Sequence, residues 1–298
     1  MNGGSDSSQK PLSIERVKVL ALIAMVSDDA LMERLVLKGG NAIDLIYRAS
    51  ARPSVDLDFS IAGDFGEPLE ELQGRFRRLL EETFLPIGYR AFDVTFEPRP
   101  ASVSPELEAF WGGYRLAFKI IDAKRDFGDG IKDRRRLAAV VGPSQRRTFE
   151  VDISRFEFCD DKTEHFVDGF KVYAYSPRLI IAEKLRAICQ QMPEYRKLVK
   201  SSTARPRARD FVDIRNLSTL FRVNTDSQEF ADLLSLVFDA KRVPRELLSR
   251  IVETREYHRE DFQSVRDTVL PGVELLTFDD YFDFVVRVIE RLEPPRHE

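Results

Sequence analysis

Cysteine and histidine are scarce in this chain of 298 residues, which contains two of the former and three of the latter. Cys159 and Cys189 are too few for a disulfide framework, so the sequence agrees with a reducing compartment. His165, His258 and His297 are scattered and exclude a His-rich zinc site. Any metal would therefore be held by oxygen ligands, which points to magnesium or manganese.

Long hydrophobic runs are also missing from the sequence. No apolar stretch approaches the roughly 20 residues that cross a bilayer, and the first ten residues, MNGGSDSSQK, contain no hydrophobic signal segment. We therefore expect no membrane partner and a cytoplasmic location. A content of 43% hydrophobic and 32% charged residues is typical of a globular protein, and the length suits one large domain or two ordinary ones.

Neither sign of charge dominates, since the formal net charge is only −4. Basic residues nevertheless gather at Lys132–Arg136, at Arg146–Arg147 and along Arg196–Arg209, and such clusters can bind phosphate groups. We interpret the first two clusters as ordinary solvated surface. The third lies mostly in a long loop, Pro193 to Pro206, which suits a polyanionic acceptor but offers few aromatic side chains for stacking on bases.

The spacing of apolar residues divides the chain into two parts. Two-residue alternation or short apolar runs predict strands at residues 35–37, 55–60, 89–97, 114–122, 148–154 and 170–175. Helical spacing predicts helices at residues 13–31, 42–49 and 67–83, and then at 177–191, 208–221, 226–239, 244–254, 257–269 and 278–292. This split predicts an α+β protein with a mixed-sheet domain at residues 1–175 and a helical domain at residues 176–298.

The stretch RPSVDLDFS, residues 52–60, places two carboxylates inside an apolar run. Val55, Leu57 and Phe59 alternate with polar residues, so Asp56 and Asp58 point to the same face of a half-buried strand, about 7 Å apart at their Cα atoms. Two adjacent negative charges repel each other unless a cation lies between them. The pattern therefore indicates a metal site, although a solvated acidic strand face is the commoner explanation for either aspartate alone.

A second strand, TFEVDIS, repeats the alternation and supplies a third carboxylate. Asp152 is our candidate for the third metal ligand that two-metal catalysis requires, with Glu150 on the same face as the alternative. A strand-edge carboxylate without a role is an equal possibility for Asp152 taken alone.

The sequence Lys38-Gly39-Gly40-Asn41 follows the first short strand and begins the next helix. Glycines at such a turn let backbone N–H groups approach an anion closely. A glycine pair alone is more often a tight turn than a phosphate site. Its combination with Asp-x-Asp within twenty residues is much more specific, because it places a phosphate-binding turn beside a metal-binding pair, as a nucleoside triphosphate with magnesium requires.

The stretches LKGGNAIDLIYRASARPSVDLDF, FEVDIS, PRLIIAEKLRAICQQ and RPRARDFVDIRNL resemble, in this order, the AbiEii/AbiGii-type nucleotidyltransferases, which include the MenT-like toxins of bacterial toxin–antitoxin systems. The resemblance covers roughly residues 30–220. It implies a nucleotidyltransferase fold like that of polymerase beta, followed by the helical domain that completes the nucleotide and acceptor cleft.

The resemblance also assigns roles position by position. It implies nucleotide contacts for Lys38, Gly39, Gly40, Asn41, Arg52, Ser54, Lys184, Arg207, Arg209 and Asp213, metal binding by Asp56, Asp58 and Asp152, and catalytic roles for these three aspartates with Lys184 and Asp210. Asn41 stands where the superfamily usually has Ser or Thr; an amide can donate a hydrogen bond to phosphate but presents no hydroxyl.

The residues themselves leave alternatives for the helical motifs. Lys184 lies beside an apolar stripe, from which its long side chain could reach into a cleft or simply extend to solvent. Asp210 and Asp213 share one helix face near its N-terminus, where acidic residues also complement the helix dipole without any further role.

The function implied is metal-dependent transfer of a nucleotide from an NTP to an acceptor. By resemblance, the acceptor is the 3′ end of tRNA. The protein itself would be a growth-arresting toxin, counteracted by a separately encoded antitoxin. The resemblance also implies a role in phage defence. Two alternatives stay open: transfer to a protein or small-molecule hydroxyl, and a non-catalytic NTP- or RNA-binding protein.

Overall fold

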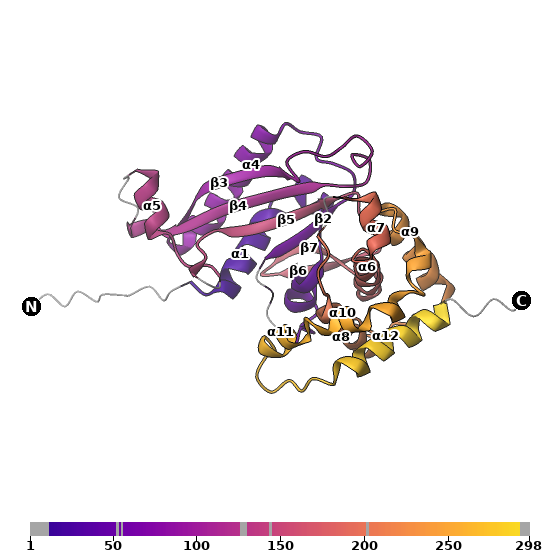
Figure 1. Cartoon of the computed structure of the whole chain (residues 1–298). Coiled ribbons are helices and arrows are strands. Elements are labelled where there is room, and N and C mark those ends of the chain that lie inside the picture. The colour runs from indigo at the N-terminus through magenta and orange to yellow at the C-terminus, as the bar shows by residue number, and fades with distance from the viewer. Residues whose placement is uncertain are drawn as a thin grey trace, which may run out of the picture.

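The computed structural model describes residues 12–51, 54, 56–125, 130–142, 145–200 and 203–292. Its centre is a seven-stranded mixed sheet with the strand order β3-β4-β5-β2-β1-β7-β6 (Figure 1). The strands are β1 (Leu35–Leu37), β2 (Leu57–Ile61), β3 (Tyr89–Arg99), β4 (Gly113–Asp122), β5 (Phe149–Arg155), β6 (Lys162–Val167) and β7 (Phe170–Tyr175). The pairs β2/β5 and β1/β7 are parallel, and the other neighbouring pairs are antiparallel.

The strand β2 lies in the interior of the sheet, between β1 and β5. Its apolar residues Leu57, Phe59 and Ile61 are fully buried, whereas Asp58 between them is only half-buried. Alternation along a strand sends successive side chains to opposite faces. The sheet therefore buries the apolar side of β2 and leaves its carboxylate side partly open.

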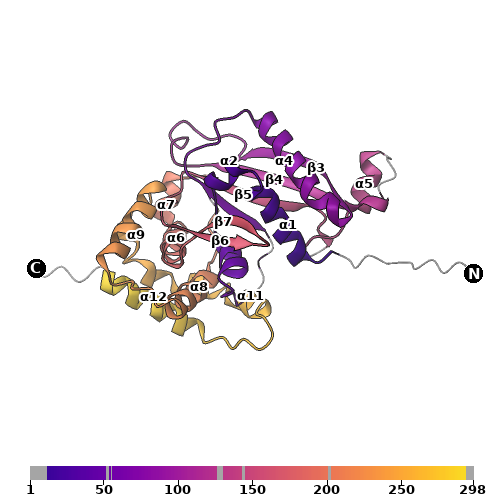
Figure 2. The ribbon, with the colours of Figure 1, turned by 180° about the vertical axis from the view of Figure 1, so that it is seen from behind.

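Helices cover the face of the sheet on which those apolar side chains lie. The helices α1 (Ile14–Val26) and α4 (Leu69–Phe84) pack against each other, and α4 packs along β3, as Figure 2 shows from behind. The side chain of Ser13 caps α1 by accepting a hydrogen bond from the Arg16 N–H at 3.2 Å. The shorter α2 (Asp29–Arg34) and the one-turn α3 (Gly39–Asn41) flank β1.

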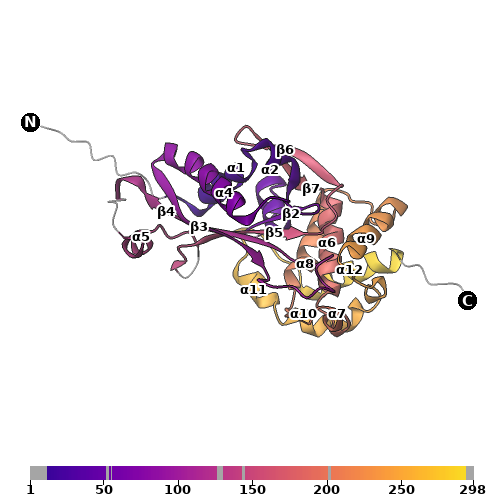
Figure 3. The same cartoon turned by 90° about the horizontal axis from the view of Figure 1, so that it is seen from above.

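Among the described residues, every strand precedes residue 176 and helices follow. These are α6 (Pro177–Cys189), α7 (Pro193–Leu198), α8 (Ala208–Leu220), α9 (Gln228–Ala240), α10 (Arg255–Arg259), α11 (Phe262–Asp267) and α12 (Phe278–Leu292). In Figure 3 this helical half lies at the end of the sheet near β7, while α5 (Ile131–Leu137) projects from the opposite end. The α6 helix begins at Pro177, as predicted, with the Ser176 side chain as its cap, and it packs against α8 and α9.

One hydrophobic core joins the two halves. Its buried members run from Val17 in α1 to Ile289 in α12 and include both faces of α6. The α+β class is thus confirmed. In the portion of the chain with described structure, none of the helices combines the length and apolar character that crossing a bilayer would need.

Several predicted boundaries differ from the structure. The helix expected at residues 13–31 is two helices, because Asp28 caps α2 with a bond from the Leu31 N–H. Residues 42–49 form a π-helical turn at Ala42–Ile46, and the predicted helices at 244–254 and 257–269 are broken into short 3₁₀ and α segments. The strand β6 and the helix α5 were not predicted, since neither has a clear apolar period. Pro193 starts α7 within the expected long loop.

Candidate active site

The glycine turn lies directly against the acidic strand. The Lys38 N–H donates to the Asp58 carbonyl oxygen at 2.9 Å, which joins the end of β1 to β2. Gly39 has φ +64°, and a Cβ atom built there would lie 3.2 Å from Oδ2 of Asp58. A Cβ atom on Gly40 would lie 2.9 Å from Oγ of Ser54. Gly39 thus has the left-handed backbone conformation that favours glycine, and a side chain on either glycine would press against Asp58 or Ser54.

Asn41 holds this turn in place. Its side chain is fully buried, and its amide donates to Oγ of Ser54 at 3.2 Å and to the Asp56 carbonyl oxygen. Because the amide is engaged inside the protein, we assign Asn41 to fixing the turn rather than to direct contact with a phosphate. Arg52, the other residue of the predicted lead-in, lies outside the described residues.

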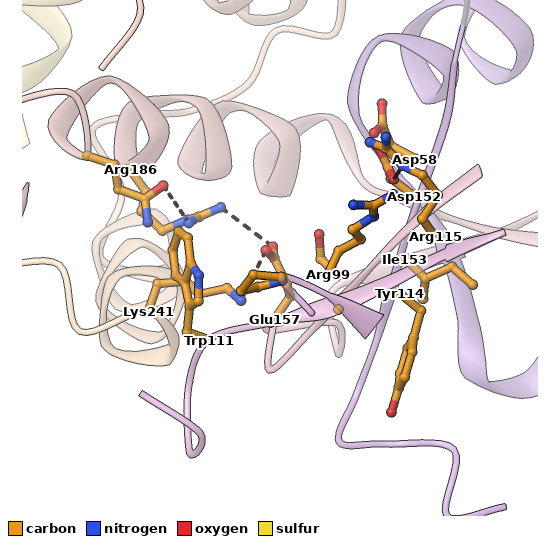
Figure 4. Close-up of a pocket in the computed structure, with 15 residues that line it drawn as sticks. Asp58, Arg99, Trp111, Tyr114, Arg115, Asp152, Ile153, Glu157, Arg186 and Lys241 are labelled. Carbon is orange, nitrogen blue, oxygen red and sulfur yellow. Dashed lines mark hydrogen bonds and ion pairs between the residues drawn. The ribbon is translucent and has the colours of Figure 1, made fainter. Parts of the chain in front are cut away.

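Asp58 and Asp152 are paired in register on the parallel strands β2 and β5. Both line a cavity of about 380 Å³, together with residues from β4 and α6 (Figure 4). Burial raises the pKa of Asp58 to about 7; Lys38 lowers it, and the neighbouring carboxylates of Asp152 and Asp56 raise it further. An additional positive charge nearby would stabilise the ionised form of Asp58 and lower its pKa.

Two arginines, Arg115 and Arg146, form ion pairs with the other carboxylates of the site. Neither arginine was predicted to lie there. Arg115 on β4 binds Asp152 through two bonds of 2.7 and 2.9 Å and contacts Glu150 at 3.0 Å. Arg146 donates to Asp56 at 2.8 Å and also lies 3.0 Å from Glu150. The interpretation of Arg146 as ordinary solvated surface was therefore wrong, because β5 brings it beside the acidic strand.

These arginines bear on the expected metal. Across the part of the chain that the structure describes, no three histidine, cysteine or carboxylate side chains are grouped as a ready metal site. Asp58 and Asp152 nevertheless supply the oxygen ligands that a hard divalent cation prefers. The Asp152 carboxylate accepts hydrogen bonds from Arg115 but keeps further lone pairs for a cation. The like-charge repulsion that raises the pKa of Asp58 is what a cation would relieve, so this pair fits a divalent ion.

The opposite wall of the cavity is basic. Glu157, just after β5, is nearly enclosed and lies 3.4 Å from Lys38, 3.5 Å from Arg186 and 3.6 Å from Lys241. Figure 4 shows Arg186 and Lys241 pointing toward Glu157 from the helical half. Burial raises the pKa of Glu157, but the three cations outweigh it and hold the pKa well below the usual range. Glu183 also pairs with Arg186 at 2.9 Å, so this wall holds three cations and two carboxylates, and the remaining positive charge favours an anionic ligand.

The predicted helical motif residues form a separate buried cluster. The ammonium of Lys184 lies 2.8 Å from Asp210 and 2.7 Å from Asp213, and Arg207 also binds Asp210. Burial lowers the pKa of Lys184, but the two aspartates outweigh it and keep the pKa above its ordinary value. Lys184, Asp210 and Asp213 are all buried. Lys184 is therefore not a solvent-exposed lysine, and the two aspartates do more than complement the helix dipole.

Glu183 connects this cluster to the glycine turn. Its charge acts on Lys38 and Asp58 on one side and on Arg207 on the other. Arg209 is exposed and borders a small pocket beside Val265, away from the residues that line the main cavity. The structure therefore brings together all the described predicted residues near the turn, links the Lys184 cluster to them through Glu183, and leaves Arg209 apart.

Sequence reasoning missed the residues that balance the charges at this site: Arg115, Glu157, Glu183, Arg186 and Lys241. Glu183 and Arg186 flank Lys184 within a quoted motif, and Arg115 lies on a predicted strand. Lys241 carries no local signal. Its neighbourhood depends on the packing of the helical half against β5, which the pattern of apolar residues does not specify.

Residues 21–284 match the sequence profile of the family described as nucleotidyl transferase AbiEii toxin, type IV TA system. No match was found among curated proteins.

Three solved structures resemble the fold at low identity. JHP933 from Helicobacter pylori shares 17% identity at a TM-score of 0.46, covering 94% of this chain and 90% of its own. A putative nucleotidyltransferase from H. pylori shares 16% at 0.45, covering 96% and 95%. MenT4, a nucleotidyltransferase toxin from Mycobacterium tuberculosis, shares 13% at 0.40, covering 94% and 83%.

A mixed sheet with paired aspartates beside a glycine turn, together with the profile match over most of the chain, defines a nucleotidyltransferase. The chain belongs to the AbiEii nucleotidyltransferase toxin family of type IV toxin–antitoxin systems.

Proposed function

We propose that this protein transfers a nucleoside monophosphate from an NTP to the 3′ end of tRNA in a reaction that depends on Mg²⁺ or Mn²⁺. The observation that carries the proposal is the registered pair Asp58 and Asp152, which faces a cavity beside the Gly39–Gly40 turn. This arrangement offers carboxylates for a cation and a backbone turn for phosphates within one site.

In this proposal Asp58 and Asp152, with Asp56 beside them, would hold the divalent cation, which would supply charge neutralisation at the reacting phosphate. The glycine turn and Lys38 receive the triphosphate, and Arg186 and Lys241 supply positive charge on the far wall of the cavity. The acceptor hydroxyl oxygen forms a bond to the α-phosphorus while the bond to the pyrophosphate oxygen breaks.

The hydroxyl proton needs a base at the site. Because the cation would occupy Asp58 and Asp152, water in the cavity takes this proton, helped by the positive charge that the cation would bring. Lys184 acts through its buried ion pairs with Asp210 and Asp213, which fix the start of α8 relative to α6. We assign Lys184, Asp210, Asp213 and Arg207 to positioning and Ser54 to the periphery of the nucleotide site, whereas Arg209 lies apart from it.

The biological setting follows from the toxin family. Addition of a nucleotide to tRNA ends blocks aminoacylation and arrests growth in the cytoplasm, and a cognate antitoxin protein counteracts the arrest. We also propose that the chain divides functionally at residues 1–175 and 176–298, with the helical part completing the cleft.

The test is transfer of radiolabel from each of the four α-labelled NTPs to total tRNA. We expect label in tRNA with wild-type protein and Mg²⁺ or Mn²⁺, loss with EDTA, and a loss of about 100-fold or more in Asp58→Asn. The exposed Asp232→Asn on α9 is the matched control and should keep the wild-type rate.

Absence of label in tRNA with all four NTPs would overturn the tRNA assignment. Label appearing instead in a co-purified protein or a small molecule would establish the other acceptor class. NTP binding without any transfer, measured by calorimetry with and without Mg²⁺, would indicate a non-catalytic binding protein.

A further inference from the structure

A second cavity adjoins the one that contains Asp58. Its volume is about 620 Å³, and it shares Pro100 and Trp111 with the first cavity. It lies between the segment 100–111, which connects β3 to β4, and the helix α7 with the residues just after it. A cavity of this size is within the range of small-ligand sites, yet it has no role in the NTP site described above.

Trp111 forms the boundary between the two cavities. It is the only tryptophan in the chain and is half-buried. The Lys241 ammonium lies 5.8 Å from the centre of its ring, and the Tyr195 ring lies 6.5 Å away. Figure 4 shows the indole at the end of the first cavity nearest the helical half. An indole held in this way offers a stacking surface at the point where the two cavities meet.

The outer part of the second cavity combines positive charge with apolar and hydroxyl groups. Lys197 and Lys200 on and after α7 are both exposed, and Glu106 lines the same cavity. Val103, Leu107 and Leu198 supply apolar surface. Two lysines opposite one carboxylate leave the cavity positive, which matches a phosphodiester backbone.

We propose that the second cavity binds the terminal nucleotides of a single-stranded nucleic acid acceptor, with a base stacked near Trp111 and backbone phosphates at Lys197 and Lys200. This inference rests on the proposed function, because it gives the acceptor of the transfer reaction its path to Asp58. Stacking aromatics and a basic groove are the two features by which proteins bind single strands.

The lysine-rich segment after residue 193 already suggested a polyanion, but it contains few aromatics. The fold supplies the missing aromatic from position 111, which is more than eighty residues away in the chain. Continuity through Trp111 places the end of a strand bound in the second cavity at the entrance of the catalytic cavity. An NTP base is a less suitable occupant, because a single base leaves the outer lysines without phosphates.

The lone tryptophan makes the proposal directly measurable. A ten-nucleotide single-stranded RNA with a 3′-deoxy end should quench Trp111 fluorescence of the full-length protein in a saturable way, without NTP. In Lys197→Glu/Lys200→Glu the dissociation constant should rise about ten-fold or more at ~0.1 M salt, and the salt slope should fall by about 0.7 for each lost phosphate contact. Arg77→Glu/Arg78→Glu, exposed on α4, makes the same change in net charge and should stay within about two-fold.

Steady-state kinetics of nucleotide transfer test whether the second cavity binds the acceptor or the NTP. In Lys197→Glu/Lys200→Glu the KM for tRNA should rise about ten-fold or more while the KM for NTP stays within about two-fold. Trp111→Phe should retain most of the acceptor affinity and Trp111→Ala should lose it, since any aromatic ring can stack.

An increase in the KM for NTP instead, or equal RNA binding by both charge-reversed variants, would overturn the inference. If wild-type protein labels tRNA but the lysine pair has no effect, only the inference fails. If the RNA binds with the expected lysine dependence and no nucleotide is transferred, the proposed function fails while the binding site stands.

Discussion

At the scale of single residues, charge balance decides how the cavity is built. Glu157 is buried among Lys38, Arg186 and Lys241, and the Tyr175 hydroxyl donates to it at 3.4 Å. On the opposite wall, Arg115 holds Asp152 by two short bonds. Ion pairs therefore stabilise both sides of the cavity. On one side several cations surround the Glu157 carboxylate, and on the other Arg115 lies between the carboxylates of Asp152 and Glu150.

Replacing Glu157 by glutamine should lower the free energy of unfolding near pH 7 by about 3–5 kcal/mol, because it leaves buried cations uncompensated. The pKa of Glu157 is held below its ordinary 4.5, so its carboxylate stabilises the folded state above about pH 4.5 and loses that contribution as the pH falls. Urea unfolding at pH 7 and at pH 3.5 measures the effect.

The matched control for this measurement is Glu82→Gln, which removes an exposed partner of Arg78 at 3.6 Å. It should change the free energy of unfolding by about 0.5 kcal/mol or less. A destabilisation of Glu157→Gln that is equally large at both pH values would contradict the assignment of charge to Glu157.

At the scale of elements, two neighbouring strands and one turn form the site. The parallel pairing of β2 with β5 sets Asp58 opposite Asp152, and β4 adds Arg115 opposite Asp152 from the other side. The turn after β1 has φ +64° at position 39, which favours glycine, and a Cβ atom there would press against the Asp58 carboxylate of β2. The geometry of the catalytic groups is thus fixed by backbone pairing rather than by flexible loops.

Gly39→Ala should destabilise the protein by about 1–2 kcal/mol, because an L-residue is strained at φ +64°, and should reduce nucleotide transfer at least about ten-fold by pushing Asp58 Oδ2. Gly74→Ala in α4 is the control. No atom lies within 4 Å of its Cβ position, so it should stabilise the protein by about 0.5–1 kcal/mol with unchanged transfer. Thermal unfolding and label transfer test both variants; equal behaviour of the two would exclude a special role for the turn.

At the scale of the whole molecule, the helical half closes the cavity and shares its core with the sheet. Lys241, after α9, donates to the carbonyl oxygens of Phe110 at 3.4 Å and Arg155 at 2.5 Å. Phe110 lies just before β4 and Arg155 ends β5, and both segments flank the cavity. The α6 helix is buried along most of its length between β7 and the helices α8 and α9. The acidic wall therefore comes from the sheet and much of the basic wall from the helices.

A fragment of residues 12–175 should not fold on its own, because loss of the helical half exposes the apolar surface of β7 and leaves Glu157 without Arg186 and Lys241. We expect the fragment to show no cooperative thermal transition by circular dichroism and poor dispersion of its amide resonances. The full chain should show a cooperative transition and well-dispersed resonances. A cooperatively folded fragment would instead show that the predicted division at residue 175 separates independent domains.

Much of the fold and the centre of the site could be predicted from particular residues. The alternation around Asp58 and Asp152 predicted two strands with carboxylates on one side, and the helical spacing from residue 177 predicted the start of α6 correctly. The π-helical turn, β6 and α7 could not be predicted, because their conformations depend on neighbours distant in sequence. The contacts of Lys184 were not predicted for the same reason, since its partners lie 26 and 29 residues later.

The sequence by itself determined the α+β class, the paired aspartates and the glycine turn, because these depend on local periodicity and on residues close together in the chain. Only the tertiary structure decided that Arg146 neutralises Asp56, that Lys241 joins the cavity wall and that Trp111 lies between two cavities. Those pairings follow from which strands lie side by side and from how the helices pack, and packing is set by the whole core at once.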